Sequence, residues 1–140
     1  MAQDVRFADI EVGQSIPEAC MPTIGPVQLA LFAAASADHN PIHLDEQAAK
    51  AGGLPGVIAH GMLSMALLGR MLTRWVPQRR IRHFSARFTA MAVPGDALTC
   101  KGVVTAKREV DGERLVDLEI HAENQRGERI VAGHATVALP

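Results

Sequence analysis

The residues best suited to chemistry lie in one short segment, SADHNPIHLD, at residues 36–45. Asp38 offers a carboxylate and His43 an imidazole, and two such groups facing one water molecule can exchange protons with it. Histidine suits this exchange because it titrates near neutral pH. Asp38 also fits a plain turn or capping role, because aspartate and asparagine favour such loops. The residues alone therefore leave both roles open.

A metal site is a second use for the polar residues, since His39, His43 and His60 with Asp45 offer nitrogen and oxygen ligands. The His-x-x-x-His spacing of His39 and His43 would put both rings on one side only within a helix. Pro41 lies between them and prevents a regular helix. We therefore expect no metal here. His39 and Asp45 are expected to be bystanders, and His60 a structural residue ahead of the next helix.

The elements on either side of this segment must hold it in place. VQLALFAAASA, at residues 27–37, has the pattern of a short amphipathic helix, with Pro26 at its first position. Asn40-Pro41 is expected to end that helix, because the residue before a proline is disfavoured in the α conformation. We expect residues 38–43 to form an extended, ordered loop. DEQAAKA, at residues 45–51, then adds one helical turn before a glycine-rich break.

A second helix is predicted from His60 to Trp75, and it is apolar on nearly every side. A helix that is hydrophobic all round is usually buried. Its small residues (Gly61, Ser64, Ala66 and Gly69) leave room for another backbone to approach closely. We therefore expect this helix at the centre of the molecule.

The second half of the chain changes to a period of two, which predicts strands with one buried and one wet face. The expected strands are HFSARFTA (83–90), ALTCKGVVTAK (97–107), LVDLEIHA (115–122) and RIVAGHATVAL (129–139), with an irregular edge strand within residues 12–24. Turn signals at Pro94-Gly95-Asp96, Asp111-Gly112 and Arg126-Gly127 separate them. This order predicts an α+β fold in which an antiparallel sheet wraps around one central helix. The edges of such a sheet favour a dimer.

Composition sets limits on the class of protein. The 140 residues predict one domain over residues 1–140, and the net charge of −1 provides no overall field for nucleic acid or an anionic membrane. The N-terminal residues lack the pattern of a secretory signal, and the longest apolar run is too short to span a bilayer. Cys20 and Cys100 are expected to be reduced core thiols. We expect a cytoplasmic protein.

SADHNPIHLDEQAAKAGG, followed by GVIAHGMLSMALLG and ARFTAMAVPGD, resembles the MaoC-like family of (R)-specific enoyl-CoA hydratases and 3-hydroxyacyl-ACP dehydratases. The motif Asp-x-Asn-Pro-x-His together with AHGM is specific, and the resemblance covers nearly the whole chain. It implies the hotdog fold, in agreement with the order of elements above. It also implies that Asp38 and His43 are the catalytic pair, that Asn40 orders the loop, and that the Gly61 amide polarises a thioester carbonyl.

The implied reaction is the reversible addition of water to a trans-2-enoyl thioester, giving an (R)-3-hydroxyacyl thioester on coenzyme A or an acyl carrier protein. No cofactor is expected beyond that carrier. Some family members carry a serine on the central helix where Gly69 stands here, so the acyl-chain preference stays open. Alternatives are a hotdog thioesterase and a non-catalytic acyl-thioester-binding subunit.

A cluster of arginines lies between residues 70 and 87, and it includes Arg79 and Arg80. Guanidinium groups pair well with phosphate. The cluster is therefore a candidate surface for the phosphates of coenzyme A or for an acidic carrier protein. It fits a solvated surface equally well.

Overall fold

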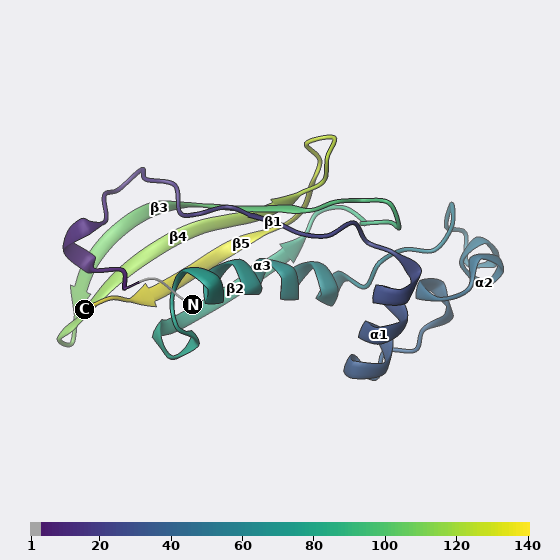
Figure 1. Cartoon of the computed structure of the whole chain (residues 1–140), viewed down its shortest axis with the longest axis horizontal. Coiled ribbons are helices and arrows are strands. Elements are labelled where there is room, and N and C mark those ends of the chain that lie inside the picture. The colour runs from purple at the N-terminus through teal and green to yellow at the C-terminus, as the bar shows by residue number, and fades with distance from the viewer. Residues whose placement is uncertain (1–3) are drawn as a thin grey trace.

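The computed structural model describes residues 4–140, and its main feature is a curled antiparallel sheet around one long helix (Figure 1). The strand order across the sheet is β1-β3-β4-β5-β2. The strands are β1 (Ala19–Cys20), β2 (Ile81–Phe88), β3 (Thr99–Val110), β4 (Glu113–Glu123) and β5 (Arg129–Ala138). The predicted fold class is confirmed. The expected irregular edge strand within residues 12–24 consists of β1 and an isolated bridge between Ser15 and Val103 of β3.

The alternation of buried and more exposed side chains explains why these segments form strands, as β4 shows. Val116, Leu118, Ile120 and Ala122 are buried, and the residues between them face the other side. The turn from β3 to β4 has positive φ at both Asp111 (52°) and Gly112 (81°), as a two-residue type I′ turn requires. The connection from β2 to β3 is different. β2 lies at the far edge beside β5, so residues 89–98 must cross the sheet instead of making the short turn that we expected.

The central helix α3 (Gly61–Trp75) lies in the concave face of the sheet (Figure 1). Leu68 and Leu72 are fully buried, and Met71 is 1 % exposed. The expectation of a helix buried on every side is wrong, because one stripe of α3 is exposed. This stripe consists of Met62, Ala66, Arg70 and Thr73.

Two glycines of α3 let the edge strand β2 pack closely beside it. A Cβ added at Gly69 would lie 3.2 Å from the ring of Phe84, and one added at Gly61 would lie 3.3 Å from the ring of Phe88. Small residues on α3 were predicted to admit a close neighbour, but that neighbour is a pair of aromatic rings and not a backbone. The two contacts also show that β2 and α3 run in opposite directions.

The remaining helices stand outside the sheet, at the end where α3 begins (Figure 1). They are α1 (Pro26–Ser36), the 3-10 turn η2 (Pro41–His43) and α2 (Glu46–Ala51). We refer to residues 26–51 as the outer lobe. Two expectations are corrected here. Helix α1 ends at Ser36 because Ala37 adopts a left-handed conformation (φ 56°), so Asn40-Pro41 does not end it. Pro41 begins a 3-10 turn, so residues 41–43 are not extended.

The N-terminal segment contains the 3-10 turn η1 (Phe7–Asp9), and a third such turn, η3 (Gln78–Arg80), follows α3. Both cysteines are free, but only Cys100 is buried, so the prediction of two core thiols is wrong for the exposed Cys20. Cys20 pairs with Thr99 and Cys100 pairs with Ala19, which puts the two thiols on opposite faces of the sheet. Within residues 4–140, no helix has the length and apolar character needed to cross a membrane.

Candidate active site

Asp38 and His43 meet at the end of the molecule where α3 begins. The Asp38 Oδ2 and His43 Nε2 atoms are 3.7 Å apart. The imidazole is buried, with 9 % of its side chain exposed, whereas half of the Asp38 side chain is open to solvent. A separation of 3.7 Å is too long for a direct hydrogen bond and suits one water molecule that contacts both groups.

The loop that carries the pair is folded by its own side chains. Asp38 Oδ1 accepts a hydrogen bond from the amide of Asn40 (3.3 Å), and Asn40 Oδ1 accepts one from the amide of Ile42 (3.2 Å). Asn40 thereby begins the 3-10 turn that contains His43. The turn role and the acid/base role of Asp38 are therefore compatible, because each uses a different carboxylate oxygen.

The hydrogen bonds of His43 indicate its tautomer. Its Nδ1 lies 2.7 Å from the carbonyl oxygen of Ile58, and a carbonyl oxygen can only accept. Nδ1 therefore carries the hydrogen. In the neutral ring, Nε2 is then a free acceptor that faces the Asp38 carboxylate. This arrangement leaves Nε2 available for proton exchange.

His60, predicted to be a structural residue ahead of α3, contacts both Asp38 and His43. It precedes the first residue of α3 and is 1 % exposed. Its ring stacks on that of His43 with the centroids 3.8 Å apart, and its Nε2 lies 3.1 Å from the carbonyl oxygen of Asp38. The one signal in the sequence was its position beside Gly61 in AHGM.

Asp38, His43 and His60 have potential ligand atoms within 4.8 Å of one another, so these three residues are the group that could bind a metal ion. His39 and Asp45, which we had considered as ligands, are not among them. The two imidazoles are stacked with their planes 24° apart. A ring nitrogen binds a metal in the plane of its ring, so two nearly parallel stacked rings cannot both aim at one ion. The trio does not fit a metal site.

Gly61 is the first residue of α3, so its amide N–H has no acceptor within the helix. The positive end of the helix dipole lies at the same place. Because Gly61 directly follows His60, it lies at the same end of α3 as Asp38 and His43. The structure thus brings together Asp38, His43, Asn40 and Gly61, as the sequence analysis expected.

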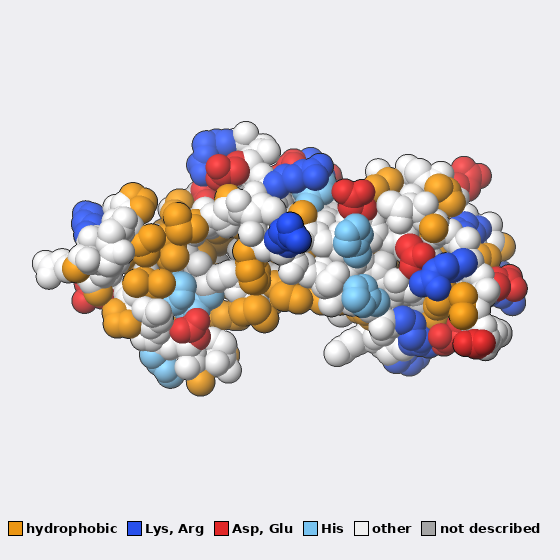
Figure 2. All heavy atoms as spheres, turned by 180° about the vertical axis from the view of Figure 1, so that it is seen from behind, with side chains coloured by type: hydrophobic (Ala, Val, Ile, Leu, Met, Phe, Trp, Pro, Cys, Tyr) orange, Lys and Arg blue, Asp and Glu red, His pale blue; other side chains and the backbone are white. Residues whose placement is uncertain are grey.

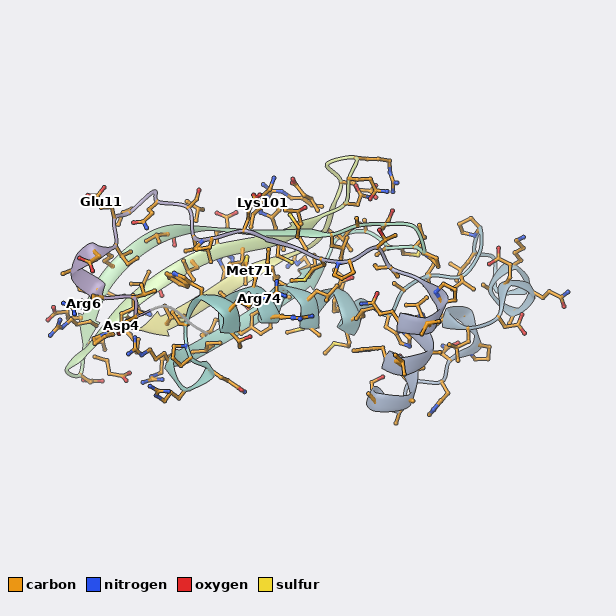
Figure 3. All side chains as sticks on the ribbon, viewed as in Figure 1. Asp4, Arg6, Glu11, Met71, Arg74 and Lys101 are labelled. Carbon is orange, nitrogen blue, oxygen red and sulfur yellow. The ribbon has the colours of Figure 1, made fainter. Side chains whose placement is uncertain are left out.

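The arginines lie elsewhere. Arg79 and Arg80 belong to η3, beyond the far end of α3, and a helix of that length spans about 22 Å. Figure 3 shows Arg74 on α3, apart from α1 and α2. Arg82 is engaged by Glu113, whose pKa is lowered by hydrogen bonds from that guanidinium. Within one chain, Arg79 and Arg80 do not share the end of α3 that carries Asp38.

His39 and Asp45, the two residues expected to be bystanders, differ in their surroundings. His39 is exposed. Asp45 caps α2, where its Oδ1 accepts hydrogen bonds from the amides of Gln47 (2.8 Å) and Ala48 (3.1 Å).

Large apolar side chains are exposed on the elements around the pair. They come from α1, the residue after η2, the start of α3 and the end of β2 with the loop that follows it: Val27, Leu31, Leu44, Met62, Phe88 and Met91. Figure 2 shows hydrophobic side chains gathered over this half of the molecule. An exposed apolar patch of this kind marks a surface for a ligand or a partner.

Comparison with known proteins settles the family. A model described as the MaoC like domain matches residues 6–126. The chain belongs to the MaoC-like family. It is 33% identical over 133 residues to an (R)-specific enoyl-CoA hydratase of Aeromonas caviae, a match that covers 94% of this chain and 96% of the hydratase. Hydration of an enoyl-CoA is a hydro-lyase activity.

This MaoC-like protein also matches small parts of much larger proteins. It is 33% identical over 129 residues to the fatty acid synthase subunit beta of Aspergillus oryzae, but that match spans only 6% of the synthase subunit. The chain spans only 3% to 6% of the length of four fungal fatty acid synthase proteins that it matches.

Solved structures agree on the fold. The (R)-hydratase of A. caviae superposes with a TM-score of 0.82 at 32% identity, over 94% of this chain and 98% of the hydratase. The R-hydratase PhaJ1 of Pseudomonas aeruginosa also gives 0.82, at 34% identity, over 99% of this chain and 88% of that one. The curled sheet around α3 is the hotdog fold of these hydratases.

Proposed function

We propose that this protein is a hydro-lyase that interconverts trans-2-enoyl thioesters and (R)-3-hydroxyacyl thioesters, with residues 1–140 acting as one dehydratase domain in the cytoplasm. The observation that carries the proposal is the Asp38–His43 pair, 3.7 Å apart, beside the free amide at the start of α3. The similarity to an (R)-specific enoyl-CoA hydratase over nearly the whole of both chains supports it.

Asp38 and His43 together hold and activate the attacking water. The water donates one hydrogen to Nε2 of His43 and the other to the Asp38 carboxylate. As its oxygen attacks C3 of the enoyl group, the proton moves to Nε2, and the carboxylate stabilises the imidazolium that forms. The imidazolium of His43 then gives this proton to C2, which completes the addition of one water and restores the neutral ring. Positioned acid/base groups of this kind accelerate a reaction by roughly 10²–10⁴-fold.

The Gly61 amide stabilises the negative charge that develops on the thioester oxygen. Removal of one such donor typically costs about 3 kcal/mol of transition-state stabilisation. Glycine suits the position because no side chain stands between the amide and the thioester. The ring of Phe88 lies against this residue and would form one wall of the site.

The substrate is an acyl group carried by coenzyme A or by the phosphopantetheine of a carrier protein, and no metal or further cofactor takes part. The exposed apolar residues around the pair would contact the acyl chain.

We further propose that the protein works as a homodimer in which each copy contributes to the site of the other. Within residues 4–140, the outer edge of β2 pairs with no strand. Antiparallel pairing of two β2 strands would bring Phe88 of one copy beside Ile81 of the other. Arg79 and Arg80 of the second copy would then lie near Asp38 and could bind the phosphates of the carrier.

The test is hydration of crotonyl-CoA by the purified protein, followed as loss of the enoyl absorbance. We expect activity in the wild type and a loss of about 10²–10⁴-fold in kcat for Asp38→Asn and for His43→Gln. His39→Gln is the matched control, because His39 is an exposed histidine of the same loop. Circular dichroism should show that all three variants keep the fold.

Near-normal hydration by both Asp38→Asn and His43→Gln would refute the mechanism. Release of free thiol without loss of the enoyl group would identify a thioesterase instead. An inactive protein that gains activity only with a second subunit would point to a binding subunit.

A further inference from the structure

We propose that His60 is a positioning residue for this reaction, which fixes the backbone of Asp38 and the ring of His43 at the same time. The inference rests on the hydratase function proposed above. His60 lies 22 positions after Asp38 in the sequence, and its imidazole contacts both members of the pair.

The contact with Asp38 is a hydrogen bond to its backbone. His60 Nε2 donates to the Asp38 carbonyl oxygen over 3.1 Å, because a carbonyl can only accept. The hydrogen of the neutral His60 ring is therefore on Nε2. The carboxylate of Asp38 is half exposed, and the loop that carries it stands outside the sheet. The hydrogen bond from the buried His60 to this carbonyl fixes the backbone of Asp38. It thereby fixes the distance between the Asp38 carboxylate and Nε2 of His43.

The contact with His43 is a ring stack. The centroids are 3.8 Å apart, and the ring of Phe32, from α1, meets the ring of His60 edge-on with a centroid separation of 4.9 Å. His60 is thus enclosed by Phe32 and His43. The His43 ring is restrained twice, by this stack and by its bond to Ile58. Both restraints keep its Nε2 facing the Asp38 carboxylate.

A structural role alone does not account for a histidine at this position. Its Nδ1 is buried and has no hydrogen-bond partner among the described residues. A buried acceptor without a donor lowers stability, and a phenylalanine would fill the same space between two rings without that cost. The part of His60 that a phenylalanine cannot replace is the N–H that holds Asp38.

The experiment compares His60→Phe, His60→Gln and the control His39→Gln in the hydration of crotonyl-CoA. His60→Phe keeps a stacked ring and loses the N–H. We expect its kcat to fall about 10–100-fold with KM within about twofold, and its melting temperature to equal or exceed that of the wild type. His60→Gln keeps an N–H donor and should recover part of the lost kcat, even if its melting temperature is lower.

A double variant separates positioning from an independent effect. Because His60→Phe keeps the stack on His43 and loses the bond to Asp38, its effect must pass through Asp38, and adding it to Asp38→Asn should lower kcat by much less than it does in the wild type. Equal and multiplicative losses in kcat would overturn the proposal. Wild-type kcat in His60→Phe would do the same, as would a kcat loss that follows the melting temperature across both variants.

Histidine ¹⁵N NMR of the wild-type protein provides a test without substitution. We expect the hydrogen on Nε2 of His60 and on Nδ1 of His43, and the opposite tautomer of His60 would refute the inference. An inactive wild type with the expected tautomers would contradict the hydratase function and leave the role of His60 in ordering this loop supported.

Discussion

The two oxygens of the Asp38 carboxylate have separate tasks. Oδ1 closes the turn onto the Asn40 amide, while Oδ2 faces Nε2 of His43. A carboxylate that also closes its own loop cannot rotate freely, so its free oxygen stays aimed at His43. This explains why the acid/base pair can reside on a loop outside the sheet and still keep a fixed geometry.

The two cysteines differ in burial, so their reactivity toward an alkylating reagent tests the structure directly. Burial raises the pKa of the Cys100 thiol to about 12, so it remains protonated and inert, whereas Cys20 is exposed. Iodoacetamide at pH 8 should therefore label Cys20 alone in the native protein, and both cysteines in denaturant. Mass spectrometry of the labelled peptides makes the measurement. Native labelling of Cys100 would contradict the packing of β3.

At the scale of single residues, the sequence was most informative where neighbours in the chain act together. Asp38, Asn40 and His43 lie within six positions, and their spacing around Pro41 indicated a functional loop. The contacts of His60 could not be predicted, because its stack on His43 depends on how the outer lobe folds back onto the start of α3. Asp45 was predictable only as a polar residue, since its cap becomes visible once α2 is placed.

Strand β2 is the element that depends most on small residues. Gly61 and Gly69 accept the rings of Phe88 and Phe84 on its inner side, and Gly133 of β5 faces it from the neighbouring strand. A Cβ added at Gly133 would lie only 1.8 Å from the carbonyl oxygen of Ser85. No side chain can be accommodated there without separation of the two strands.

Gly133→Ala should therefore be strongly destabilising. We expect a loss of about 3 kcal/mol or more in the free energy of unfolding, because the clash is with backbone that cannot move aside. Gly25→Ala is the control: nothing lies within 4 Å of its added Cβ and its φ of −135° suits any residue, so its expected loss is only the roughly 1 kcal/mol of a poorer N-cap for α1. Urea denaturation measures both variants. A urea midpoint for Gly133→Ala equal to that of Gly25→Ala would show that β2 and β5 are not paired as described.

Elements with a clear period could be predicted from the sequence, and their ends could not. The strands from residue 81 onward and the helix from residue 61 follow alternation and helical spacing closely. The end of α1 was placed too late, since an alanine (Ala37) in the left-handed region ends it, and alanine carries no signal for that conformation. The exposed stripe on α3 was missed because Met62 and Ala66 are apolar residues on an open face.

For the molecule as a whole, the open edge of β2 and the distant arginines lead to one expectation. The purified protein should have twice the monomer mass in analytical ultracentrifugation. Arg79→Ala/Arg80→Ala should raise the KM for an acyl-CoA about fivefold and weaken the salt dependence of KM, while the mass stays unchanged. A KM that is insensitive to both the substitution and salt would remove these arginines from carrier binding.

The outer lobe has a consequence for how the protein loses activity. Only Leu29 and Ala33 of α1 are buried, and Phe32 and His43 of the lobe contact Ile58 and His60, just ahead of α3. Segments with few buried contacts open locally before the core unfolds. On heating, hydration activity should therefore disappear before the far-ultraviolet signal of the sheet, and amides of residues 26–51 should exchange with deuterium faster than those of β4. Coincident loss of both signals would show that the lobe and the sheet unfold as one unit.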